Sequence, residues 1–124
     1  MSLKKILIVD DERGFTEMVK LNLEATGYYQ VKIENRGTHA LSTALKYKPD
    51  LILLDVIMPE LEGPDVVNQL KRDPDLQDVP VVFLTATVTK EEVDVQGGFI
   101  GGHAFIAKPS SLEKLINCVR DHIG

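Results

Sequence analysis

Short apolar runs recur along the chain, and four of them end at a residue with ligand-binding chemistry. The runs are Ile6–Val9, Leu51–Leu54, Val81–Leu84 and Ala104–Ala107. Apolar runs of this length, bounded by turn residues, are typical of strands buried on both faces. The residues that follow them are Asp10 with Asp11, Asp55, Thr85 and Lys108. A fifth segment, Tyr29 to Glu34, alternates apolar and polar residues and also predicts a strand.

Between these strands the apolar residues follow helical spacing. Phe15, Met18, Val19 and Leu23 predict a helix that ends at Gly27. Further helices are predicted over Ala40–Leu45, around Val66–Leu70 with Pro64 in the first turn, and over Leu112–Ile123. Thr89 with Glu92 has capping-box spacing and predicts the start of a fourth helix. Glycines 97, 98, 101 and 102 disfavour its tail, so it is expected to be short or frayed.

Five strands that alternate with five helices predict a parallel sheet covered on both faces. No linker, internal repeat or low-complexity stretch interrupts this pattern. We therefore expect a single three-layer α/β domain over residues 1–124.

Parallel strands bring their polar ends to one edge of the sheet. In open α/β sheets, ligands bind at that edge where the strand order reverses. In the order 2-1-3-4-5 the reversal lies between strands one and three, which end at Asp10, Asp11 and Asp55. Such a cluster of carboxylates requires protonation or a cation, and hard oxygen ligands suit Mg²⁺.

The turn after the first strand argues against direct binding of a nucleotide or flavin. Such binders place a glycine-rich loop there, whereas this chain has Asp10-Asp11-Glu12-Arg13. Because this acidic turn repels anions unless a metal intervenes, the site is expected to be built around a cation, and to accept a phosphoryl group only with that cation present. Lys108 suits a phosphate oxygen, the Thr85 hydroxyl can donate to another, and Asp55 can form an acyl phosphate.

Composition and charge exclude several other classes of function. With a net charge of −5, the chain lacks the excess of basic residues that is typical of nucleic-acid-binding proteins. The apolar runs are far shorter than a membrane span, and the N-terminus lacks a signal-peptide pattern, so we expect a cytoplasmic protein. The single cysteine, Cys118, excludes an internal disulfide.

These segments together resemble the receiver domain of two-component response regulators over essentially the whole chain. The resemblance is carried by Ile8–Glu12, Leu54–Pro59 with Gly63, Leu84–Ala86 and Phe105–Pro109. It implies a flavodoxin-like fold, and the strand order 2-1-3-4-5 comes with that fold class.

The resemblance also implies roles for individual residues. Asp55 would be the phosphoacceptor, and Asp10, Asp11, Asp55 and the backbone carbonyl of Ile57 would hold Mg²⁺ or Mn²⁺. Thr85 and Lys108 would bind the phosphoryl oxygens, while Thr85 and Phe105 would act as the conformational switch. The Lys108–Pro109 bond would match the cis peptide of the family.

The implied partners are a sensor histidine kinase or a phosphotransfer protein, and a downstream target or fused output domain. Output would pass through the face of helix four, strand five and helix five, through which such domains often dimerise when active. The glycine-rich segment 97–102 departs from the family pattern on this face.

Two alternative functions compete with the switch. One is a receiver-like interaction module that works without phosphorylation, against which the complete acidic set, Thr85 and Lys108 argue. The other is a metal-dependent phosphatase that passes through an aspartyl phosphate. Such an enzyme needs a second aspartate two residues after the nucleophile, where this chain has Ile57.

Overall fold

The computed structural model describes residues 3–55, 63–85, 99–100, 103–107 and 112–123. Its strands are β1 (Lys4–Val9), β2 (Tyr29–Glu34), β3 (Leu51–Asp55), β4 (Val81–Thr85), β5 (Phe99–Ile100) and β6 (His103–Ala107). They form one sheet in the order β2-β1-β3-β4-β6-β5. All neighbouring strands are parallel except β5 and β6, which pair antiparallel. The five predicted strands and their order are confirmed.

The strand β5 was not predicted, and the expectation that its residues belong to a helix was wrong. Phe99 and Ile100 were expected in the tail of a fourth helix, but they pair with Ala104 and His103 at the sheet edge. Glycines on both sides disfavour helix, whereas an aromatic and a β-branched residue favour a strand. The predicted start of that helix at Thr89 lies outside the described residues.

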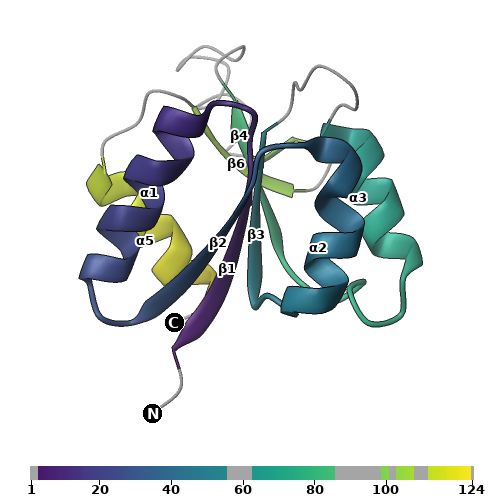
Figure 1. Ribbon diagram of the computed structural model, residues 1–124, viewed down its shortest axis with the longest axis horizontal. Helices are drawn as coiled ribbons and strands as arrows, with labels where there is room; N and C mark the ends of the chain where they lie inside the picture. Colours follow the sequence, from purple (N-terminus) through teal and green to yellow (C-terminus); the bar gives the residue numbers. More distant parts are fainter. Residues whose placement is uncertain (1–2, 56–62, 86–98, 101–102, 108–111, 124) are drawn as a thin grey trace.

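Helices cover both faces of the sheet, as the alternating pattern predicted. The helices α1 (Arg13–Ala25) and α5 (Leu112–Ile123) lie on one face, and α2 (Ala40–Tyr47) and α3 (Gly63–Arg72) lie on the other (Figure 1). A short 3₁₀ turn, Gly37–His39, precedes α2 and was not predicted. This three-layer arrangement confirms the predicted fold class.

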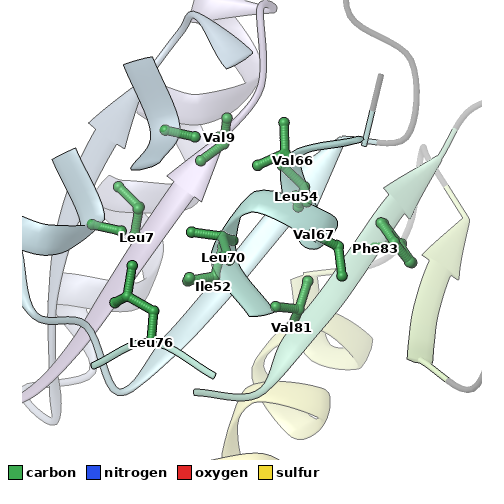
Figure 2. Close-up of a cluster of buried hydrophobic side chains, with 12 residues drawn as sticks. Leu7, Val9, Ile52, Leu54, Val66, Val67, Leu70, Leu76, Val81 and Phe83 are labelled. Atoms are coloured by element: carbon green, nitrogen blue, oxygen red, sulfur yellow. The ribbon is translucent and has the colours of Figure 1, made fainter. Parts of the chain in front are cut away.

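The alternation of side chains along each strand divides the buried residues between two cores. Ile6 and Ile8 face α1 and α5, where they pack with Leu53, Leu23 and Val119. Leu7 and Val9 point to the opposite face and join the core beneath α2 and α3. Figure 2 shows this second core, in which the labelled side chains are Leu7, Val9, Ile52, Leu54, Val66, Val67, Leu70, Leu76, Val81 and Phe83. Side chains on both faces are thus fully buried, which explains the continuous apolar runs.

Two helix ends show how the chain turns back towards the sheet. After α1, Gly27 adopts a φ of 82°, which glycine tolerates without steric cost. After α2, the left-handed position is held by Lys48, with φ 57° and ψ 63°. Pro49 follows directly and disfavours right-handed helical geometry at Lys48, so the helix ends here as predicted.

We expect Leu53→Ala to lower the free energy of unfolding by about 2–5 kcal/mol, because it leaves a cavity in a fully buried site. Leu21→Ala on α1 is the matched control, since Leu21 is 71% exposed and should change stability by about 0.5 kcal/mol or less. Urea denaturation followed by circular dichroism measures both. Equal losses in the two variants would contradict the assignment of the core.

Candidate metal and phosphoryl site

Strand register brings the predicted acidic residues to the same edge of the sheet. Val9 pairs with Leu54, so the residues that follow them lie side by side, Asp10 directly after β1 and Asp55 as the last residue of β3. Oxygen atoms of Asp10, Asp11 and Asp55 lie within 4.8 Å of one another. The three carboxylates predicted from separate segments therefore form one cluster.

Burial differs among the three carboxylates. Asp10 is fully buried and Asp55 is 6% exposed, whereas Asp11 is exposed. At such a separation, two ionised carboxylates repel by about 3 to 4 kcal/mol at an effective dielectric constant of about 20. A cation between them would offset this repulsion, so the cluster is electrostatically suited to a metal ion.

The geometry of the cluster fits a small divalent ion. Two oxygens on opposite sides of an octahedral Mg²⁺, each at about 2.1 Å, are about 4.2 Å apart. The observed limit of 4.8 Å is slightly longer. A small movement of the exposed Asp11 side chain, or a water molecule between one carboxylate and the ion, would accommodate the difference. The donor set consists of carboxylates, which are the hard oxygen ligands that Mg²⁺ prefers.

Asp10 is held at its backbone and at its side chain. Its backbone N–H donates to the Glu34 carbonyl (3.1 Å), which extends the ladder between β1 and β2 by one residue. Its Oδ1 accepts from the Glu12 N–H (3.0 Å), which closes the turn into α1. The turn that carries Asp10 and Asp11 is thus anchored to the sheet on one side and to a helix start on the other.

Asn35 contacts this turn and was not identified from the sequence. Its Nδ2 group donates to the Asp10 carbonyl (2.7 Å) and to the Thr16 hydroxyl (3.2 Å). The signal that selected Asp10 and Asp55, a polar residue directly after a strand, also selects Asn35 when it is applied to β2. That strand was recognised, but its end was not considered.

The remaining predicted site residues are described only in part. Thr85 ends β4 beside β3, and its backbone pairs with Ala107. The residue after Ala107 is Lys108, which lies outside the described residues, as do Ile57 and Pro109. Phe105 lies in β6 opposite Phe83. The register therefore places the backbone of Thr85 and of Ala107, the residue before Lys108, at the same edge of the sheet as the acidic cluster.

A cavity of about 270 Å³ lies at the other edge of the sheet. It is lined by Leu45, Lys48, Pro49, Asp75, Leu76 and Val79. Pro49 and Val79 precede the starts of β3 and β4, so this cavity faces the amino ends of the strands. It is separate from the acidic cluster at their carboxyl ends.

Tyr47 and Cys118 have clearly shifted pKa values, and both residues lie away from the acidic cluster. Burial raises the pKa of Tyr47 to about 12, with Glu24 and Asp50 contributing, and its hydroxyl donates to the Gln30 carbonyl (3.0 Å). Burial, with a smaller contribution from Asp121, raises the pKa of the Cys118 thiol to about 11. Both shifts favour the protonated, unreactive form.

His122 does not activate the Cys118 thiol. The His122 Nδ1 atom lies 2.7 Å from the Cys118 carbonyl oxygen, so this nitrogen carries a proton and donates it there. The thiol sulfur lies 3.7 Å from the same nitrogen, which has no lone pair left to accept the thiol proton. A cysteine–histidine nucleophile is therefore not formed on α5.

Comparison with known proteins identifies the chain. The family described as the response regulator receiver domain matches residues 6–120. The chain belongs to this family. The match confirms the family that the sequence motifs indicated. A receiver domain is a signalling module of two-component systems.

Individual relatives agree with this assignment. The polar-differentiation response regulator DivK of Brucella anthropi is 36% identical over 123 residues, which cover 98% of this receiver domain and 97% of DivK. A probable cyclic di-GMP phosphodiesterase of Vibrio cholerae is 38% identical over 119 residues, but the match covers only 26% of that protein. The crystallised chemotaxis protein CheY4 of Vibrio cholerae superposes with a TM-score of 0.83 at 28% identity, covering 98% and 99% of the two chains.

None of the helices in the described part of this receiver domain has the length and apolar character needed to cross a membrane.

We predict that iodoacetamide alkylates Cys118 in the folded protein at pH 7.5 at least about tenfold more slowly than in the denatured protein. The raised pKa lowers the thiolate fraction about 100-fold, and the greater nucleophilicity of a more basic thiolate offsets only part of that loss. Mass spectrometry measures the rate, which should rise with pH towards about 11. Equal rates in the folded and denatured protein would contradict this account.

Proposed function

We propose that this receiver domain is a phosphorylation-activated switch in which Asp55 accepts a phosphoryl group with the help of Mg²⁺. The observation that carries the proposal is the convergence of Asp10, Asp11 and Asp55 within 4.8 Å at the carboxyl edge of the sheet. We further propose that residues 1–124 act as one domain. Membership of the receiver family supports the proposal from an independent direction.

The residues of the cluster divide the chemistry between them. Asp11 and Asp55 would ligate Mg²⁺ together with the Ile57 backbone carbonyl, and Asp10 would contribute through a water molecule. The bound cation would neutralise the carboxylates and the incoming phosphoryl oxygens, which otherwise repel one another. Mn²⁺ presents similar chemistry to the same hard ligands.

In the transfer step, a carboxylate oxygen of Asp55 attacks the phosphorus of a phosphohistidine on the donor protein. A new O–P bond forms as the N–P bond breaks, and the leaving imidazole nitrogen keeps the electron pair and takes up a proton. Positioning and charge neutralisation, rather than acid–base catalysis, lower the barrier for such a transfer. Thr85 and Lys108 would hold the phosphoryl oxygens after transfer.

The phosphodonor would be a sensor histidine kinase or a phosphotransfer protein. An exposed apolar face on α1 supports docking next to the acidic cluster, because α1 begins directly after Asp11 and Glu12. Met18 is 46% exposed and Leu21 is 71% exposed on this face. Large apolar side chains that gather on a surface favour a protein contact there.

Phosphorylation would act by shifting a two-state equilibrium. Thr85 would move towards the phosphoryl group and Phe105 would turn inward, which would change the face of the predicted fourth helix, β6 and α5. That face would bind the downstream target or output domain, and would be the surface of any phosphorylation-dependent dimer. An interaction module that works without phosphorylation is the alternative.

The decisive experiment is intact-protein mass spectrometry after incubation with acetyl phosphate and Mg²⁺. We expect a gain of one phosphoryl group that is lost in Asp55→Asn and in the presence of a chelator. Asp65→Asn, at an exposed position on α3, is the control and should be labelled as the parent protein is. Labelling that persists in Asp55→Asn would refute the assignment of the phosphoacceptor.

Metal binding can be tested separately from phosphorylation. We expect Mg²⁺ at about 100 times its Kd to raise the free energy of unfolding by about 2.7 kcal/mol, because only the folded chain presents the cluster. Asp11→Asn should remove this gain, whereas Asp65→Asn should retain it. Urea denaturation with and without Mg²⁺ provides the measurement, and a gain of the same size in Asp11→Asn would contradict the metal site.

A further inference from the structure

Asn35 connects three segments that meet at the acidic edge. It follows the last residue of β2, and its amide group donates to the carbonyl of Asp10, which follows β1. The same nitrogen donates to the Thr16 hydroxyl on the buried side of α1. One side chain thus links the ends of β2 and β1 with the first turns of α1.

The hydrogen-bond directions in this link are determined by its chemistry. Thr16 Oγ1 lies 2.9 Å from the Arg13 carbonyl oxygen, to which it donates its only proton. The hydroxyl can therefore only accept from Asn35, and the Asp10 carbonyl can only accept as well. A neutral amide with two N–H donors meets both requirements, whereas a carboxylate at this position would donate to neither.

The Asp10 carbonyl belongs to the peptide group that joins Asp10 to Asp11. Fixing the plane of this peptide restricts the directions in which the Asp11 side chain can leave the backbone, because only rotation about the Asp11 N–Cα bond then remains. Asp10 is buried, but Asp11 is exposed, so packing does not fix the Asp11 carboxylate. Its placement opposite Asp55 depends on the backbone that carries it.

We propose that Asn35 is a positioning residue of the metal site and that it acts through the Asp10–Asp11 peptide group. Its amide holds this peptide so that the Asp11 and Asp55 carboxylates present a shared cation site before the ion arrives. This inference rests on the proposed function, because it assumes that the cluster binds Mg²⁺. Side chains that orient ligands without touching the metal commonly change metal affinity by about 10- to 100-fold.

The test compares Mg²⁺ affinity in Asn35→Leu with affinity in Thr43→Val, measured by isothermal titration calorimetry on the unphosphorylated protein. Leucine has nearly the shape of asparagine but no donor. The Thr43 hydroxyl donates to the carboxylate of Glu34 (2.7 Å), so the control removes a side-chain hydrogen bond from the neighbouring residue of β2. We expect a 10- to 100-fold weaker Kd in Asn35→Leu and a change below about twofold in Thr43→Val.

Stability and phosphorylation distinguish positioning from a merely structural role. Both variants should lose some stability, but only Asn35→Leu should lose metal affinity. At saturating Mg²⁺ its phosphorylation by acetyl phosphate should return to the parent level, because the defect lies in forming the cation site. Asn35→Ala provides a second, less bulky variant if Asn35→Leu does not fold, and the same loss of affinity is expected.

Each outcome bears on the inference in a defined way. Parent-like Mg²⁺ affinity in folded Asn35→Leu or Asn35→Ala would overturn the positioning role while leaving the proposed function intact. Equal loss of affinity in Asn35→Leu and Thr43→Val would also overturn it, since any weakening of β2 would then suffice. Absence of Mg²⁺ binding by the parent protein would overturn the metal site itself, and this inference with it.

Discussion

The parallel pairing of β1 with β3 is the constraint on which the site depends. This register sets Val9 opposite Leu54, so two aspartates separated by 45 residues in sequence become neighbours at the carboxyl edge of the sheet. A slip of one residue would turn every side chain of β1 to the other face. The two buried cores oppose such a slip, because Ile6 and Ile8 belong to one and Leu7 and Val9 to the other. The packing of the sheet therefore also places the carboxylates.

The acidic cluster concentrates like charge where the protein is otherwise apolar. Asp10 and Asp55 emerge from strands whose preceding residues are fully buried, and water has little access to either carboxylate. This unfavourable placement of like charges is maintained by the surrounding strands and by two hydrogen bonds to Asp10, one from the Glu12 N–H and one from the Asn35 amide. A bound cation would relieve this repulsion between the carboxylates, and the same cation would offset the negative charge of an incoming phosphoryl group. In the proposed function, cation binding would therefore draw on an electrostatic imbalance that folding creates.

Prediction from the sequence succeeded where one physical signal dominated. Continuous apolar runs identified β1, β3 and β4, because strands buried on both faces have no solvent side to alternate with. The residues at their ends were placed correctly because parallel strands share one carboxyl edge. Prediction failed at Phe99 and Ile100, where the local sequence only weakly favours a strand over a helix and pairing with β6 determines the strand. It also missed Asn35, whose importance lies in contacts with residues 19 and 25 positions away.

The sequence by itself determined the fold class, the family and the set of chemically capable residues at the strand ends. These properties follow from local periodicity and from residue types, which a linear pattern records directly. Only the tertiary structure decided that Asp10 is buried while Asp11 is exposed, that burial raises the pKa of the Cys118 thiol, and that the Asn35 amide, directly after β2, donates to the Asp10 carbonyl. Burial, pKa and hydrogen-bond partners depend on which distant segments meet, and that is settled only when the sheet and its helices pack together.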